Sequence, residues 1–167
     1  LLVLPGETGF LVLGDTKLCG QADLPPCVAA VESYCVGAPN SAGPGATLSG
    51  IGEPLIATNA FGLALDGAPQ GSISMFFYGL GEAQLPFGDG FLCLSPLVPG
   101  ILRLPDPVVV DAQGHAERML DFTKPPLATG PITSYSTWRF QAWYRDPAGP
   151  LGTGVNTSDA LRVTFCP

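Results

Sequence analysis

Charged side chains are scarce in this 167-residue chain, and positive ones are the scarcest. Lys and Arg together number 7 against 14 Asp and Glu, so the formal net charge at pH 7 is -7. A protein that binds the phosphates of nucleic acid needs a basic surface, which this composition lacks. We therefore expect neither nucleic acid nor an anionic membrane surface among its partners.

Long apolar runs are also missing. A helix needs roughly 18 consecutive apolar residues to span a bilayer, and Gly or Pro interrupts every apolar stretch well before that length. We expect a protein that does not span a membrane. Hydrophobic residues still make up 46% of the chain, which is enough for a packed core and argues against a disordered chain.

The residues that usually carry catalysis are few. His115 is the only histidine, and the chain contains no GxSxG elbow and no Cys-His motif. A Ser-His-Asp triad stays open, because its members can lie far apart in a sequence. The carboxylates are too many and too dispersed to single out the pair that a glycosidase needs. We expect no enzymatic activity.

Turn-forming residues, by contrast, are abundant, with 22 Gly and 18 Pro. They exclude a helical bundle and favour short strands joined by many turns. Strand-like segments recur roughly every ten residues, as in a β-sandwich or jelly roll. We predict one all-β, antiparallel domain over residues 34–167. Its expected strands are 46–49, 61–65, 72–78, 90–94, 100–104, 108–111, 115–122, 136–145 and 159–166.

Two segments near the end of the chain alternate between apolar and polar residues. In the first, one face carries Trp138, Phe140, Ala142 and Tyr144, and the other carries Arg139, Gln141 and Trp143; in the second, Leu161, Val163 and Phe165 oppose Arg162 and Thr164. Such alternation predicts half-buried antiparallel strands. We expect the two to form a hairpin around a loop at 148–157, with Arg145 pairing with Asp159 or Asp146 at its base.

Residues 1–33 differ from the rest and are predicted to form an N-terminal extension. Pro25 and Pro26 favour a short helical turn over 27–33. The two short apolar runs before them predict buried strands, which either pair within their own sheet or are covered by a neighbouring subunit. The runs consist of Leu1, Leu2, Val3 and Leu4 and of Phe10, Leu11, Val12 and Leu13.

The apolar extension leads to the main functional hypothesis, a non-catalytic extracellular structural subunit. Donating a strand to the next copy, repeated head to tail, gives a homopolymer such as a filament or surface matrix. The alternative is a secreted adhesion or carbohydrate-binding accessory domain. Its ligand surface, for a glycan, is predicted at Trp143, Gln141 and Arg139, unless Trp143 is covered like most large aromatic residues.

The five cysteines favour structural disulfides. They are Cys19, Cys27, Cys35, Cys93 and Cys166. None forms a CxxC pair or lies near a histidine with metal-ligand spacing, which disfavours zinc and thioredoxin-like chemistry. Disulfides place the protein in an oxidising, extracellular or cell-surface location. The odd count leaves one thiol over, and the spacing leaves the connectivity open.

Calcium is the one metal that the composition suggests, although no cofactor is our main expectation. Oxygen ligands lie at predicted turns, namely Asp89, Asp106, Asp111, Asn156 and Asp159. None follows the Dx[DN]xDG pattern of a calcium loop. Turn formation without metal is the simpler interpretation of these residues.

Several short motifs follow one another in an order that resembles a known module. They are Tyr34-Cys35 before an Asn40-Ser41 loop, Phe77-Tyr78-Gly79, Phe91-Leu92-Cys93, the stretch 141–147 (QAWYRDP), the stretch 156–161 (NTSDAL) and Phe165-Cys166-Pro167. They resemble a recurrent C-terminal module of secreted planctomycete and myxobacterial proteins, over residues 34–167. The resemblance implies a β-rich, disulfide-bearing extracellular domain with no assigned role. Similar modules usually carry additional cysteines, so their pairing is not transferred.

Overall fold

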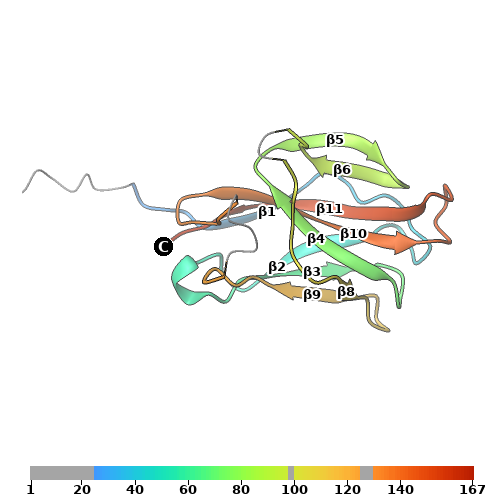
Figure 1. Ribbon diagram of the computed structural model, residues 1–167, viewed down its shortest axis with the longest axis horizontal. Coiled ribbons are helices and arrows are strands. Elements are labelled where there is room, and N and C mark those ends of the chain that lie inside the picture. Colours follow the sequence, from blue (N-terminus) through green and yellow to red (C-terminus); the bar gives the residue numbers. More distant parts are fainter. Residues whose placement is uncertain (1–24, 98–99, 125–129) are drawn as a thin grey trace, which may run out of the picture.

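The main element of the fold is a six-stranded antiparallel sheet (Figure 1). The computed structural model describes residues 25–97, 100–124 and 130–167. The sheet has the order β1-β11-β10-β4-β7, and β8 also pairs with β4. Its strands are β1 (Ala30–Tyr34), β4 (Ile73–Gly79), β7 (Leu102–Arg103), β8 (Val108–Val109), β10 (Thr137–Asp146) and β11 (Gly154–Thr164).

Two smaller sheets cover the main sheet on opposite sides. In Figure 1 the three-stranded sheet lies below it and a β-hairpin lies above it. The three-stranded sheet contains β2 (Thr47–Ile51), β3 (Gly62–Asp66) and β9 (Ala116–Met119), and the hairpin contains β5 (Glu82–Phe87) and β6 (Gly90–Leu94). The prediction of an antiparallel all-β sandwich is confirmed. Within the described residues, the one helical element is the 3-10 turn η1 (Ile56–Thr58), and no helix is long and apolar enough to cross a membrane.

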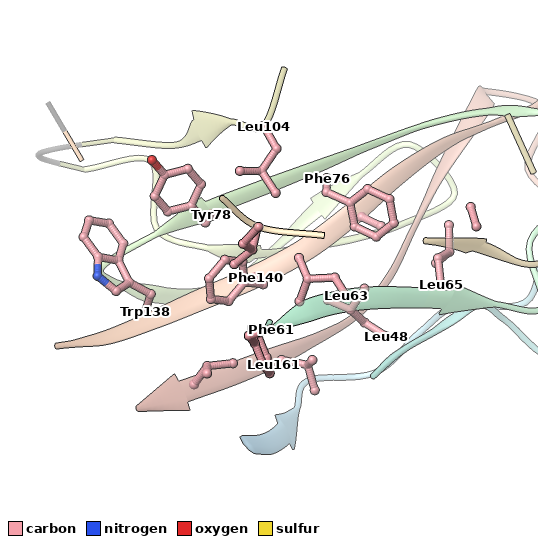
Figure 2. Packing of buried hydrophobic residues seen from close by; sticks show 14 of the residues in the cluster. Leu48, Phe61, Leu63, Leu65, Phe76, Tyr78, Leu104, Trp138, Phe140 and Leu161 are labelled. Carbon is pink, nitrogen blue, oxygen red and sulfur yellow. The ribbon is translucent and has the colours of Figure 1, made fainter. Parts of the chain in front are cut away.

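The main core fills the space between the six-stranded and three-stranded sheets (Figure 2). Side chains alternate between the faces of a strand, so β4 directs Phe76 and Tyr78 inward while β3 contributes Leu63 from the other side. The rings of Tyr78 and Phe140 stack with centroids 5.8 Å apart. All four residues of the predicted apolar face of β10 lie in this core: Trp138, Phe140, Ala142 and Tyr144.

A second, smaller core lies on the outer face of the main sheet, beneath the β5–β6 hairpin. It contains buried Phe77 of β4 and Leu94 of β6, with Trp143 packed against them. The disulfide between Cys35 and Cys93 joins the end of β1 to β6 at this core. The hairpin is therefore fixed to the main sheet by apolar packing and by a covalent bond.

The segment before the sandwich differs from the sequence prediction. Residues 27–33 form no helical turn; instead β1 pairs with β11 from Ala30 opposite Thr164 to Tyr34 opposite Ala160. Pairing with a long neighbouring strand outweighs the weak local preference for a helical turn. The predicted boundary between residues 33 and 34 falls inside β1, and the apolar runs at 1–4 and 10–13 lie outside the described residues.

The hairpin between β10 and β11 forms as predicted, but its loop is shorter than expected. β11 begins at Gly154, so the loop covers residues 147–153. Arg145 pairs with neither predicted partner: its guanidinium carbon lies 5.3 Å from the centroid of the Trp143 ring. Asp159 instead accepts hydrogen bonds from the Ser33 hydroxyl at 2.7 Å and from the Leu48 amide at 2.6 Å. These bonds link β11 to β1 within the main sheet and to β2 in the three-stranded sheet.

The described residues contain two disulfides. Cys27 is bonded to Cys166, which attaches the segment before β1 to the C-terminal end of the chain, and Cys35 is bonded to Cys93. Cys19 lies outside the described residues. Of the five predicted disulfide candidates, the structure thus pairs four.

Candidate functional site

An apolar cavity of about 320 Å³ opens on the outer face of the main sheet, beside the β5–β6 hairpin. We call it the Trp143 groove. Its volume lies at the lower end of the roughly 300–1,000 Å³ typical of ligand sites. It is lined by Met75 and Phe77 of β4, Trp143 of β10, Phe87 and Leu92 of the hairpin, and Ile101 and Arg103 at β7.

The register of the strands brings these side chains together. Trp143 lies opposite Met75 in the pairing of β10 with β4, and Phe77 lies opposite Arg103 in the pairing of β4 with β7. Because alternate residues of β4 enter the main core, Met75 and Phe77 point to the outer face. The small core beneath the hairpin closes the inner side of the groove, and the outer side is open.

Apolar surface continues from the groove to the nearby edge of the sheet. Phe87 is 43% exposed, Ile73 is 49% exposed and Val109 is 64% exposed. Ile73 and Val109 lie opposite each other where β4 pairs with β8. A contiguous apolar surface next to a cavity is typical of an interaction site rather than of free surface.

Two arginines lie at the groove. Arg103 lines it, and Arg145 lies over the Trp143 ring in a cation–π contact. Among the lining residues that the structure describes there is no carboxylate. The groove therefore suits an apolar ligand with negative charge near its ends.

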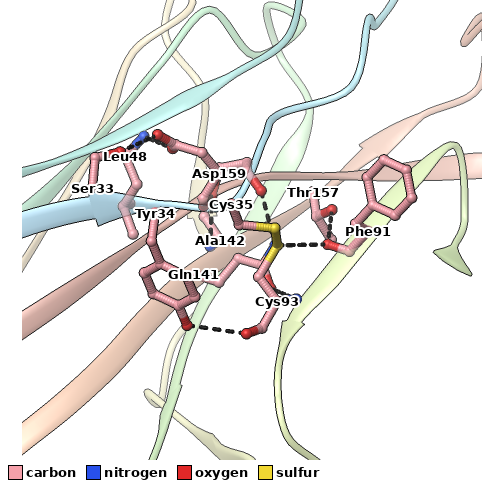
Figure 3. Close-up of a disulfide and its surroundings, with 11 residues drawn as sticks. Ser33, Tyr34, Cys35, Leu48, Phe91, Cys93, Gln141, Ala142, Thr157 and Asp159 are labelled. Carbon is pink, nitrogen blue, oxygen red and sulfur yellow. Dashed lines mark hydrogen bonds between the residues drawn. A yellow bond between two sulfur atoms is a disulfide. The ribbon is translucent and has the colours of Figure 1, made fainter. Parts of the chain in front are cut away.

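Of the three predicted ligand-surface residues, Trp143 alone lies in the groove. Gln141 is fully buried. Its Nε2 donates hydrogen bonds to the carbonyls of Phe91 and Ser158, each at 2.8 Å, and its Oε1 accepts one from the Cys93 amide at 2.9 Å (Figure 3). The prediction that Gln141 faces a ligand is wrong, because the hairpin covers this part of the outer face.

Arg139 is held away from the groove by an ion-pair network. Its guanidinium lies 3.0 Å from Glu82, which also pairs with Arg162 at 2.8 Å; Arg162 in turn pairs with Glu32 at 2.8 Å. Partial desolvation raises the pKa of Glu82, but the hydrogen bonds from Arg162 and Arg139 outweigh it and hold that pKa below its usual value. The outer face is thus charged toward one end and apolar toward the other.

Four of the five residues proposed as calcium ligands use their side-chain oxygens to accept hydrogen bonds from the protein, and Asp106 is exposed. The Asp89 carboxylate accepts from the amides of Leu151 and Thr153, both at 3.1 Å, and Asp111 accepts from the His115 amide at 2.9 Å. The Asn156 side-chain oxygen accepts from the Thr157 amide at 2.8 Å. Across the described ranges, no three His, Cys, Asp or Glu side chains gather as a metal site requires.

His115 has no arrangement that would make it a catalytic base. Its Nδ1 lies 2.7 Å from Asp66 and its Nε2 lies 3.0 Å from Glu117. Hydrogen bonds with Asp66 and Glu117 raise the pKa of His115 above its ordinary value. Both ring nitrogens are engaged with carboxylates, which leaves neither for activating a nucleophile.

Most of the groove was not predicted as a site, although part of it had a sequence signal. The alternation over 72–78 places Met75 and Phe77 on one face of their strand, and the pairing of β4 with β10 makes this the face of Trp143. Phe87 and Leu92 reach the groove only through the position of the hairpin, which no local pattern encodes.

Comparisons with protein-family models, with curated proteins and with solved structures gave no match. The resemblance to the secreted planctomycete and myxobacterial module therefore stays a prediction. In this structure the residues of its motifs contact one another. Phe91, for example, accepts hydrogen bonds from both Gln141 and Thr157, which is a structural rather than a chemical role.

Proposed function

We propose that the protein is a non-catalytic extracellular structural subunit that self-assembles head to tail through its apolar N-terminal segment. The observation that carries this proposal is the placement of two complementary features. An apolar groove lies toward one end of the sandwich, and the chain that carries the apolar runs enters at the other end. Two such features on one molecule give a heterologous contact, which repeats without closing.

The strand register supports the placement of the groove and of the entering chain toward opposite ends of the sandwich. Ala30, where β1 begins, lies opposite Thr164, and Thr164 lies opposite Thr137 at the start of β10. Trp143 is six residues further along β10, or about 20 Å at 3.3 Å per residue. In Figure 1 the blue segment with which the described chain begins lies at the end of the sandwich opposite the β5–β6 turn.

The two disulfides support an extracellular location. Bonds such as those between Cys27 and Cys166 and between Cys35 and Cys93 persist in oxidising surroundings and are rare in the cytosol. They also suit a structural subunit, because they link the segment before β1 and the hairpin covalently to the sandwich.

The experiment that tests the proposal is the native mass of the full chain, by light scattering and negative-stain imaging, with and without residues 1–14. We expect long particles that disappear on truncation while circular dichroism still reports a folded β protein. A Cys19→Ser variant that still forms particles would separate strand-mediated assembly from intermolecular disulfides. A particle near 17 kDa at every concentration of the intact chain would overturn the proposal.

A glycan-binding accessory domain is the second candidate, favoured by the partly exposed ring of Trp143 beside Phe87. Sugars stack on such rings, although the side chains that line the groove in the described residues offer only the Arg103 guanidinium and the Trp143 indole N–H as hydrogen-bond donors. A glycan-array signal that is lost in Trp143→Ala and kept in a variant of exposed Leu151 would support it. The same array without any signal would leave self-assembly as the better account.

A further inference from the structure

We propose that the Trp143 groove is the acceptor site for assembly and that it takes the apolar run Phe10, Leu11, Val12 and Leu13 of a second copy of this chain. The inference rests on the proposed function and adds where the donated segment binds. A sheet edge such as β1 is the alternative acceptor, since edge strands pair readily with added strands.

The chemistry of the run matches the lining of the groove. The run carries four consecutive apolar side chains between Gly9 and Gly14, and the groove offers Trp143 and Phe87 together with aliphatic side chains. Phe10 adds an aromatic ring, and aromatic pairs gain stabilisation beyond the burial of their area. The apolar run at 1–4 has no aromatic residue, so the run at 10–13 matches the lining of the groove better.

The charges flanking the run and the groove are opposite in sign. Glu7 precedes the run and Asp15 follows it. Arg103 lines the groove, and Arg145 lies over Trp143. Opposite charges around an apolar contact favour the correct register and speed association.

The length of the chain before residue 25 favours a second copy over the groove of the same molecule. Pro25 follows Leu13 by twelve residue steps, which span at most about 43 Å when the chain is fully extended. Five residue steps lead from Pro25 to Ala30, which lies level with the start of β10. Six more steps along β10 lead to Trp143. These eleven steps of extended chain span about 36 Å. Docking into its own groove would thus need a nearly straight segment that reverses direction at Pro25, whereas a head-to-tail neighbour brings its groove to the segment.

Pro25 and Pro26 oppose that reversal. Two consecutive prolines hold the chain extended, because the ring fixes φ and restricts the preceding residue as well. Both prolines are exposed, and in Figure 1 the blue segment with which the described chain begins lies beyond the end of the sheets. The geometry favours delivery of the run to a neighbour.

The test compares groove variants of the full chain with a matched surface variant. Phe87→Glu and Met75→Glu each place a charge in the groove, and Leu151→Glu places the same charge at a 72% exposed position outside it. We expect the first two to weaken assembly by at least about tenfold, as loss of an interface anchor does, and Leu151→Glu to assemble within about twofold of the parent. Urea midpoints show whether each variant is folded.

A second measurement does not depend on the folding of groove variants. A photo-crosslinker at position 10, in an equal mixture of ¹⁵N-labelled and unlabelled full chains, identifies the acceptor by mass spectrometry. We expect mixed-isotope crosslinks to peptides that contain Met75, Phe87 or Trp143. Crosslinks within one copy, or to β1 of another copy, would overturn the inference.

These outcomes separate the inference from the proposed function. If truncation of residues 1–14 abolishes assembly but Phe87→Glu and Met75→Glu assemble like the parent, the groove is not the acceptor and self-assembly stands. If the parent never assembles, both proposals fail. A synthetic peptide of residues 7–15 (ETGFLVLGD) gives a further check. We expect this peptide to bind the full-chain variant Phe10→Asp and to change the fluorescence of Trp143. The same peptide with Phe10→Asp should not bind.

Discussion

The side-chain oxygen of Gln141 in β10 accepts a hydrogen bond from the backbone amide of Cys93 in β6, at 2.9 Å. Gln141 belongs to the main sheet and Cys93 to the hairpin that lies over it. Because β6 pairs with β5 and not with the main sheet, this buried amide supplies a polar link between the two layers. Together with the apolar packing and the bond between Cys35 and Cys93, this link holds the hairpin in position and so shapes the Trp143 groove.

Replacing Gln141 with Leu should therefore destabilise the fold and loosen the hairpin. The substitution leaves the Cys93 amide and the Ser158 carbonyl without this partner, and each buried orphan costs about 1–3 kcal/mol. We expect a loss of about 2–4 kcal/mol in the free energy of unfolding, measured by urea denaturation. Gln113→Leu, the same change at an exposed turn, should cost less than about 0.5 kcal/mol. Equal effects in the two variants would contradict this role for Gln141.

Gly149 should tolerate no side chain, for steric reasons. A Cβ there would clash with the carboxylate oxygens of Asp89 and Asp146, which converge on this loop. Overpacking of this kind costs about 1–3 kcal/mol, so Gly149→Ala should lower the thermal midpoint. Gly43 provides the control, since a Cβ there would have no neighbour within 4 Å and Gly43→Ala should be neutral or stabilising by up to about 1 kcal/mol. A stable Gly149→Ala would show that the two carboxylates can move apart.

Hydrophobic alternation predicted the parts of the fold in which burial follows residue type. The apolar face of β10 was predicted residue by residue, because Trp138, Phe140, Ala142 and Tyr144 alternate with polar neighbours and all enter the main core. The first half of β11 was missed because its residues are polar and yet buried. Asn156, for instance, is fully buried and donates to the Pro39 carbonyl, so its environment depends on a contact distant in sequence.

The candidate site was predictable to the extent that it lies on one strand. Alternation placed Trp143 on the outer face, but it placed Gln141 there equally, and only the hairpin decides which of them is covered. β5 contains Pro86, which argues against a strand in the middle of a sheet, and it pairs with β6 alone. Phe87 therefore reached the site through tertiary packing, which a single sequence does not encode locally.

His115 should make the stability of the fold depend on pH. Its contacts with Asp66 and Glu117 raise its pKa in the folded state, so the stabilisation is complete below the unfolded pKa of about 6.5. The stabilisation is lost as pH rises through the higher folded pKa. Because the chain has one histidine, its imidazole NMR signals report this titration without ambiguity.

The matched variants for this titration are Asp66→Asn and Glu53→Gln. We expect Asp66→Asn to lower the pKa of His115, because it replaces the charged partner at 2.7 Å with a neutral one. Glu53 is exposed and Glu53→Gln should leave the titration unchanged. A His115 pKa at or below 6.5 in the parent protein would contradict the prediction. The prediction would also be contradicted if acidification through this pH range lowered the unfolding midpoint of the parent protein relative to that of His115→Gln.

The disulfide between Cys35 and Cys93 should contribute a large share of the stability, because it closes a long loop. The two cysteines are 58 residues apart, and chain entropy predicts about 4 kcal/mol for a loop of that length. Cys35 also has a φ of 65°, a left-handed conformation that costs a residue other than glycine about 1 kcal/mol. We therefore expect Cys35→Ala with Cys93→Ala to lose about 4 kcal/mol in urea unfolding, and Cys35→Gly with Cys93→Ala to recover about 1 kcal/mol of that loss. Equal stability of the two double variants would mean that residue 35 leaves the left-handed conformation once the bond is gone, and that the disulfide imposes the local backbone as well as the position of the hairpin.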